Sequence, residues 1–304
     1  MIRNNDNTEK ILVNSKFVKN LNVTGDKLHC EAGLYVSLGR KYVIKKIGRQ
    51  YKLNSTELIL LEKSVSRYYD HLKKIIPNNV PKIFLTKIDK EKNCILLVTE
   101  YLPLGKVTAI KDISMKIKYF NEIIKLILKI SNKKGNTSGN KLKCSIDPNP
   151  DNFFLDSENK IVYNDFTPPL YRENGKWVEF RRRDEAHAKK SEKETRYFSE
   201  INLLLAFINK TRLYLTLDEY LKFSRSHFST NNKVKQFVKI FDEVRSERVA
   251  SFDKLEKHVV RRDLLRFALS FRKGLTSTQV GELYKKSKKP NGVVFLEKKY
   301  ISLI

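Results

Sequence analysis

Apolar and polar residues alternate along much of the first hundred positions. This pattern is typical of β-strands, because successive side chains of a strand point to opposite faces. Gly39-Arg40-Lys41 is expected to form a tight hairpin turn, and a second polar turn is expected at 89–93. The first part of the chain therefore predicts a small antiparallel sheet, with strands at 17–23, 33–38, 42–47, 82–87 and 94–100.

The spacing of apolar residues becomes helical elsewhere. Two strongly amphipathic segments, 55–76 and 114–132, are each expected to bury one face, and Ser55 is the expected N-cap of the first. Residues 1–15 are expected to form a flexible lead-in. The chain is therefore expected to be α+β and to end in helices, predicted at 197–215, 217–226, 234–249, 252–271 and 277–286.

The stretch 144–171 carries the candidate chemistry. Asp147 and Asn152 form a D-x-x-x-x-N pattern, which a short apolar run follows directly. A polar turn at 157–160 and a second apolar run then lead to Asp165. Phosphoryl transfer needs this order, because one carboxylate orients a hydroxyl nucleophile while an Asn and an Asp hold Mg²⁺. Asp147 is thus the candidate catalytic residue, and Asn152 and Asp165 are candidate metal ligands.

This stretch resembles the catalytic segment of the protein-kinase-like superfamily, and most of all its aminoglycoside and choline phosphotransferase branch. The resemblance covers roughly residues 20 to 170. It implies a two-lobed protein-kinase-like fold, with a small antiparallel-sheet N-lobe that has one main helix and a larger, mostly helical C-lobe. The N-lobe would span 16–102, and the C-lobe, with the catalytic loop and the acceptor region, would span 103–304.

The resemblance also implies a binding site for ATP (or GTP) and Mg²⁺. Tyr42-Val43-Ile44-Lys45 is similar to the kinase strand whose lysine binds phosphates, and strand alternation favours Lys45 over Lys46. An acid on the following helix would orient this lysine; Glu62 is favoured, and Glu57 also qualifies. The backbone of the segment that links the lobes would bind adenine, at Glu100, Tyr101 and Leu102.

Several positions depart from the kinase pattern. The region 24–33 has no G-x-G-x-x-G, and Ser145 stands where the family commonly has histidine. Asn149 replaces a phosphate-directed lysine, and the expected Asp-Phe-Gly reads Asp-Phe-Thr before two prolines. These differences point away from a protein kinase. They leave open a second interpretation, a catalytically weak or inactive pseudokinase that binds or regulates and engages a polyanion such as RNA.

The formal net charge of +27 bears on the partner. One interpretation is a polyanionic ligand, and the other is a lysine bias spread over the whole surface. Lysines occur in every segment without a basic block that alternates with Gly and aromatic residues, which favours the second interpretation. Non-specific association with polyanions follows from the charge in either case. Because such a chain repels polycationic aminoglycosides, the expected acceptor is a neutral or anionic small molecule with a hydroxyl group.

The remaining features predict a cytoplasmic protein without a transmembrane segment. The N-terminus, MIRNNDNTEK, has no hydrophobic signal region, and no stretch approaches 18 uncharged apolar residues. Cys30, Cys94 and Cys144 are dispersed, which predicts neither a disulfide framework nor a zinc site. The sequence does not indicate an oligomeric state.

Overall fold

A computed structural model describes most of residues 6–178 and parts of the chain beyond them. The described residues are 6–21, 30–48, 53–138, 141–167, 169–178, 197–198, 200–211, 214–216, 219 and 223, with the backbone of 249–251 and 293–295. The chain divides into two compact units, Met1–Asp147 with Asp151–Phe198, and Pro148–Pro150 with Ser199–Ile304. The lobe boundary expected after Leu102 therefore lies inside the first unit.

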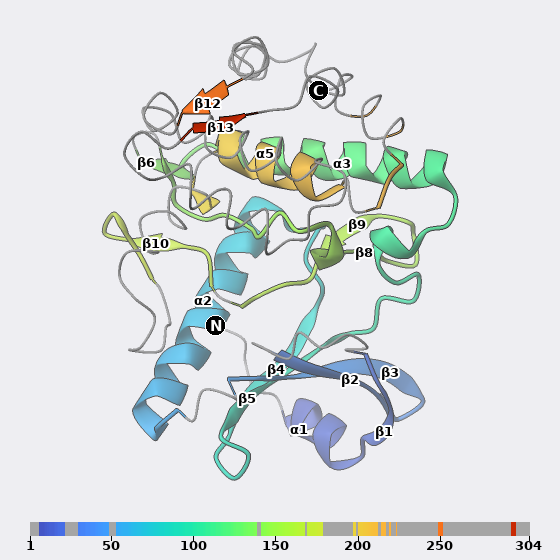
Figure 1. The fold of residues 1–304 in the computed structure, drawn as a ribbon. Helices are drawn as coiled ribbons and strands as arrows, with labels where there is room; N and C mark the ends of the chain where they lie inside the picture. Colours follow the sequence, from blue (N-terminus) through green and yellow to red (C-terminus); the bar gives the residue numbers. More distant parts are fainter. Residues whose placement is uncertain are drawn as a thin grey trace. The chain divides into compact units, whose positions relative to one another are not determined.

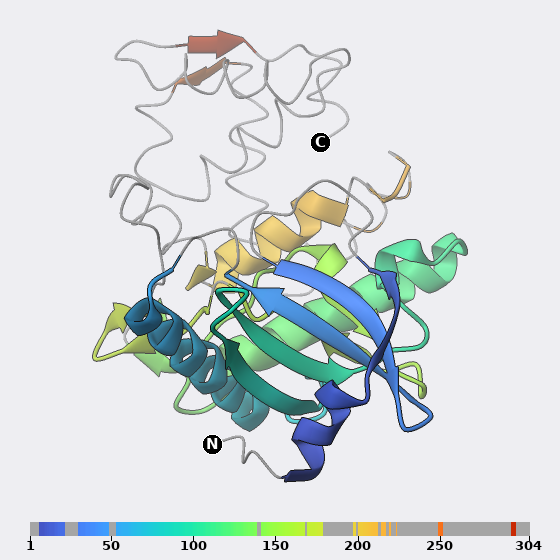
Figure 2. The ribbon, with the colours of Figure 1, turned by 90° about the horizontal axis from the view of Figure 1, so that it is seen from below.

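The first unit contains a five-stranded sheet in the order β1-β2-β3-β5-β4. Each neighbouring pair is antiparallel. Figures 1 and 2 show the sheet, with helices α1 and α2 beside it. The prediction of a mixed α+β chain with an antiparallel sheet is confirmed, with strands at Lys16–Asn20 (β1), Cys30–Ser37 (β2), Arg40–Ile47 (β3), Ile83–Asp89 (β4) and Cys94–Glu100 (β5).

The hairpin between β2 and β3 turns one residue earlier than expected. Ser37 pairs with Arg40, so Leu38 and Gly39 alone form the loop. Both have positive φ, 49° and 73°, as a type I′ turn requires. The predicted turn Gly39-Arg40-Lys41 is wrong in its register, because the right-handed twist of the strands selects this two-residue loop even with a leucine in it.

The expected flexible lead-in differs from the structure at Asp6–Val13, which form helix α1. Ile11 is only 7% exposed. It belongs to a core cluster with Tyr42 and Ile44 of β3, Leu85 of β4 and Val98 of β5. Burial of Ile11, with Leu12 packed beside it, holds this short helix against the sheet. The short apolar run 11–13 does not by itself indicate that contact in the sequence.

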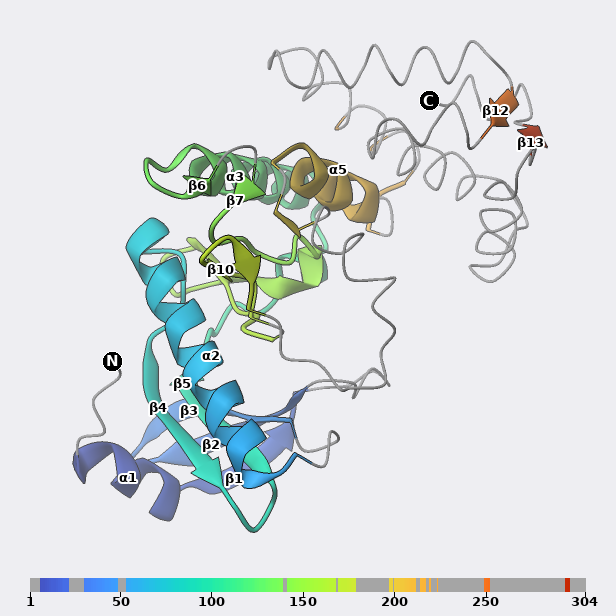
Figure 3. The same cartoon turned by 90° about the vertical axis from the view of Figure 1, so that its left-hand side faces the viewer.

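Helix α2 spans Ser55–Ile75, close to the predicted 55–76. Its N-cap is Asn54 rather than Ser55: the Asn54 side chain accepts from Glu57 N–H, and the Glu57 carboxylate accepts from Asn54 N–H, both at 2.9 Å. This capping box satisfies two backbone donors that a helix start otherwise leaves without partners. The apolar face of α2 packs against β4 and β5, and Figure 3 shows the helix running beside them.

Helix α3, Ile113–Asn132, confirms the second predicted helix and is N-capped by Asp112. Two 3₁₀ turns, Val107–Ala109 (η2) and Pro150–Asn152 (η3), lie before and after it. Short antiparallel hairpins complete the first unit. They are β6 (Thr137–Ser138) with β7 (Lys141–Leu142), β8 (Phe153–Leu155) with β9 (Ile161–Tyr163), and β10 (Arg172–Glu173) with β11 (Lys176–Trp177).

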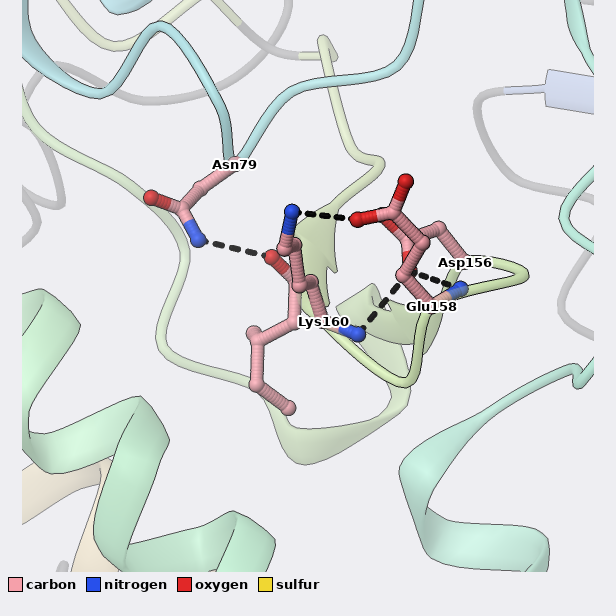
Figure 4. A network of polar contacts seen from close by, with 5 residues as sticks. Asn79, Asp156, Glu158 and Lys160 are labelled. Atoms are coloured by element: carbon pink, nitrogen blue, oxygen red, sulfur yellow. Dashed lines mark hydrogen bonds and ion pairs between the residues drawn. The ribbon is translucent and has the colours of Figure 1, made fainter.

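Hydrogen bonds hold the β8–β9 hairpin, which precedes Asp165, both at its turn and along one edge. Asp156 Oδ1 accepts from the backbone N–H groups of Glu158 and Lys160, both at 2.9 Å. Asn79, between α2 and β4, donates from Nδ2 to the Ile161 carbonyl at 2.8 Å, and its own carbonyl accepts from Tyr163 N–H at 2.8 Å. Figure 4 shows the side-chain part of this network. The hairpin is thereby attached to the end of α2.

Fewer residues of the second unit are described. Helix α5, Glu200–Thr211, confirms the middle of the helix predicted at 197–215. Strand β12, Val249–Ser251, pairs with β13, Val293–Phe295. Val249 was expected to end a helix and instead begins a strand. The other helices predicted beyond 216 lie outside the described residues, apart from Glu219 and Phe223. Among the helices described, none combines the length and apolarity that a bilayer crossing requires.

Candidate functional site

Lys45 lies in β3 and is 9% exposed. Its Nζ donates to the Asn164 carbonyl at 2.6 Å and to Asn164 Oδ1 at 2.8 Å. Lys46 points the other way and is half-buried, as strand alternation predicts. The structure thus brings the predicted phosphate-binding lysine to the residue that directly precedes Asp165, 119 positions along the chain.

Lys45 is largely removed from water. Burial lowers the pKa of Lys45, while the negative charge of Asp165 acts in the opposite direction. The ammonium also lies 5.3 Å from the centre of the Phe166 ring, within the range of a cation–π interaction. Burial in turn raises the pKa of the Cys30 thiol to about 11, which keeps that neighbour protonated at neutral pH. The lysine is therefore a desolvated cation close to a carboxylate.

Asn152 and Asp165 are in direct contact. Asn152 Nδ2 lies 3.2 Å from Asp165 Oδ2 and 3.3 Å from the Asp147 carbonyl oxygen. Asp165 Oδ1 accepts from Thr167 N–H at 3.1 Å. Backbone pairing supports the same contact, because Asn164 N–H donates to the Asn152 carbonyl at 2.9 Å. The two predicted metal ligands are side by side.

Asp147 is positioned through its backbone by Tyr163. The Asp147 N–H donates to the Tyr163 hydroxyl at 3.0 Å, and the Asp147 carbonyl accepts from Asn152. Burial is the main reason why the pKa of Tyr163 lies well above its ordinary value, so this hydroxyl stays protonated. Asp147 itself is half-buried. All three predicted catalytic and metal-binding residues thus share one hydrogen-bonded cluster.

Ser145, at the position where the family commonly has histidine, is fully buried. Its N–H donates to the Leu170 carbonyl at 2.9 Å, and its hydroxyl donates to the Tyr197 carbonyl. Its own carbonyl accepts from the Tyr68 hydroxyl of α2 at 2.7 Å. The serine therefore anchors the loop before Asp147 by hydrogen bonds to three separate segments.

The two acids considered as lysine partners have other contacts. Glu57 is part of the capping box at the start of α2. Glu62 is half-buried, and its Oε1 accepts from Ser66 Oγ at 3.1 Å. No ion pair between Lys45 and either glutamate occurs in the described part of the chain. Glu62 stays a prediction, while the role of Glu57 in the cap makes it the weaker of the two.

The predicted adenine-binding segment follows β5. Glu100 is held at both ends, because its N–H donates to the Lys82 carbonyl at 3.0 Å and its Oε1 accepts from Lys82 N–H at 2.7 Å. The backbone N–H groups of Tyr101 and Leu102 donate to no other protein group among the residues that the structure describes. They can therefore donate to a ligand.

This segment is joined to the candidate catalytic loop. Gly105 accepts from Leu155 N–H at 2.9 Å, and Lys106 forms a β-bridge with Phe154. Thr108 Oγ1 donates to Asp151 Oδ1 at 2.6 Å. The end of β5 and the β8–β9 hairpin are thereby placed in one framework.

The donor set suits magnesium. Asn152 and Asp165 offer an amide oxygen and a carboxylate, and Mg²⁺ commonly takes one or two protein oxygens, with water and phosphate completing its shell. No cluster of three or more His, Cys, Asp or Glu residues that could hold a metal occurs within the described ranges. Cys30, Cys94 and Cys144 are not joined in disulfides, as their spacing predicts.

Reasoning from the sequence missed three residues of this cluster: Asn164, Tyr163 and Tyr68. Asn164 directly precedes Asp165, and a polar residue at the end of a buried strand was the available signal. Tyr163 and Tyr68 appear in the sequence only as apolar members of a strand and a helix. Their hydroxyl groups become informative once the chain is folded, because both hold the loop that carries Asp147.

Neither a protein-family model nor a curated protein sequence matches this chain.

Proposed function

We propose that this chain is an ATP- and Mg²⁺-dependent phosphotransferase with a two-lobed protein-kinase-like fold, acting on a hydroxyl group of a small molecule. One observation carries the proposal. A desolvated lysine from β3 binds the residue next to Asp165, and Asp165 contacts Asn152 of the D-x-x-x-x-N loop. A cation beside an Asn–Asp pair is the arrangement that recognises a metal-bound nucleoside triphosphate.

Each group has a role that fits its surroundings. Lys45 would bind phosphate oxygens, because it is a buried cation whose two hydrogen bonds to Asn164 leave one ammonium proton to donate. Tyr101 and Leu102 would donate backbone hydrogen bonds to the base. Asn152 and Asp165 would hold Mg²⁺, which when bound neutralises charge on the phosphates.

Asp147 would accept or orient the proton of the acceptor hydroxyl. Its backbone N–H and carbonyl are held by Tyr163 and Asn152, so the carboxylate is attached to a rigid loop. Such positioning matters because phosphoryl transfer is catalysed mostly by orientation and charge stabilisation. With a net charge of +27, the chain repels polycations at long range and attracts anions, which favours an anionic or neutral acceptor over a polycationic one.

Nucleotide binding and turnover test the proposal separately. Binding is measured as the rise in melting temperature with ATP and Mg²⁺, since a ligand at 100 times its Kd stabilises the folded state by about 2.7 kcal/mol. Turnover is measured as ADP release with a panel of neutral and anionic hydroxyl compounds. Asp147→Asn should keep the thermal shift and lower kcat on an identified acceptor by about 100-fold or more.

Asp151→Asn is the matched control, because Asp151 lies in the same loop and its contact with Thr108 can be kept by an amide oxygen, while the ion pair with Lys106 that is lost is long, at 3.8 Å, and exposed to solvent. It should leave kcat close to that of the wild type. Full turnover in Asp147→Asn would refute the role of Asp147. If nucleotide and Mg²⁺ produce no thermal shift, and the protein binds RNA in a salt-sensitive way, the pseudokinase interpretation replaces the enzyme.

A further inference from the structure

We propose that Asn164 is the positioning residue for Lys45, in the place that the resemblance assigns to an acid on α2; this inference rests on the proposed function. The Lys45 ammonium is held by two oxygens of one residue, at 2.6 and 2.8 Å. Two acceptors on the same residue restrain both the position and the direction of the ammonium.

Asn164 also connects the lysine to the candidate metal ligands. Its N–H donates to the Asn152 carbonyl at 2.9 Å, while its carbonyl and side-chain oxygens bind Lys45. Asp165 follows directly in the chain and contacts Asn152. A single asparagine thus sets the distance between the group that would bind phosphates and the groups that would bind the metal.

The acid on α2 is engaged elsewhere. Glu62 Oε1 accepts from Ser66 Oγ, and the carboxylate whose charge acts on Lys45 is that of Asp165. Within the described residues, no carboxylate of α2 forms an ion pair with the lysine.

A neutral partner has a chemical consequence at this position. An acid paired with Lys45 would neutralise its charge, whereas an asparagine orients the ammonium and leaves the whole charge for the phosphates. It also avoids a second carboxylate beside Asp165, where like charges would repel each other. The asparagine therefore suits a lysine that is already close to one acid.

A double-mutant cycle tests whether Asn164 acts through Lys45. The affinity for ATP with Mg²⁺ is measured by calorimetry for wild type, Asn164→Ala, Lys45→Met and the double variant, and the folding of each is checked by thermal melting. Asn164→Ala should weaken binding by about 10-fold or more, because a hydrogen bond to a charged group is lost. In the Lys45→Met background the same change should have little effect, since residues that act together are not additive.

Matched variants control the cycle. Asn132→Ala, at the exposed end of α3, should not change affinity. Glu62→Ala is combined with Lys45→Met in a second cycle, in which the two effects should add. If the melting temperature of Asn164→Ala is well below that of the wild type, the first cycle is repeated with Asn164→Ser, because serine also lacks an acceptor at the Oδ1 position.

The possible results are distinct. If the effects of the substitutions at positions 45 and 164 are additive, or if Lys45 is coupled to Glu62 and not to Asn164, the inference is overturned. The proposed function still stands in that case as long as the wild type binds the nucleotide. A wild-type protein that does not bind ATP and Mg²⁺ would reject the proposed function and this inference together.

Discussion

The Tyr163 hydroxyl accepts a hydrogen bond from the Asp147 backbone N–H at 3.0 Å. Tyr163 ends β9, so this bond joins the loop before Asn152 to the strand before Asp165. The same hydroxyl lies 3.5 Å from the Tyr68 hydroxyl of α2. The Tyr68 hydroxyl in turn donates to the Ser145 carbonyl. A pair of buried tyrosines therefore connects α2 with both parts of the candidate site.

Replacing Tyr163 with phenylalanine should separate positioning from nucleotide binding. The change leaves the Asp147 N–H without this acceptor, which should lower the free energy of unfolding by about 1–2 kcal/mol. It should reduce kcat and leave the affinity for ATP and Mg²⁺ nearly unchanged, because Lys45 and Asp165 keep their contacts. Urea unfolding and acceptor kinetics measure the two effects. Tyr119→Phe is the control, since its hydroxyl makes only a 3.5 Å contact with Asn159; equal effects of both variants would contradict the prediction.

Lys45 should make the stability of the protein depend on pH in a defined direction. Burial lowers its pKa in the folded state below the ordinary lysine value of 10.5. Between the two pKa values the unfolded chain binds more protons, so stability should rise with pH, by at most about 1.4 kcal/mol per pH unit. The wild type should therefore gain stability relative to Lys45→Met as the pH approaches 10.5 from below.

Urea unfolding of both proteins at several pH values from neutral to alkaline measures this difference. Lys46→Met, on the opposite face of β3, corrects for the loss of one positive charge. A difference between the wild type and Lys45→Met that falls as the pH rises would show that burial does not dominate the environment of Lys45.

Glu57 should contribute to stability through the cap of α2 and not through the site. Glu57→Ala removes the acceptor of the Asn54 N–H and should lower the free energy of unfolding by about 0.5–1.5 kcal/mol, the net contribution of a typical hydrogen bond. The affinity for ATP and Mg²⁺ should not change. Thermal unfolding and calorimetry provide the two measurements. A large loss of affinity with intact folding would restore Glu57 as the lysine partner.

The β2–β3 turn offers a stabilising substitution. Leu38 has φ of 49° and is 73% exposed, so it gains little from packing while it occupies a backbone region that leucine rarely adopts. Leu38→Asn should raise the free energy of unfolding by about 0.5–1 kcal/mol, because Asn-Gly is a preferred type I′ pair. Gly39→Ala serves as the opposite control and should destabilise, since Gly39 has φ of 73°. Denaturant unfolding measures both changes, and a shift of the unfolding midpoint in the same direction for both variants would contradict this turn geometry.

Local pattern alone determined a large part of this molecule. Alternation in 42–47 placed Lys45 on the same face of its strand as Val43, and helical spacing predicted α2 and α3 nearly to their ends. The D-x-x-x-x-N spacing and the apolar runs after it were enough to bring Asn152 and Asp165 together, because a short hairpin joins them. These features depend on residues that are near in sequence, so their periodicity reports them.

Tertiary structure decided which distant partners meet. Lys45 binds Asn164 and not a glutamate of α2, Ile11 holds α1 against the sheet, and Asn79 attaches the β8–β9 hairpin to the end of α2. A periodic pattern tells which face of an element a side chain occupies. It does not tell which atoms of another element approach that face, because sheet register, loop hydrogen bonds and burial across the whole unit settle that together.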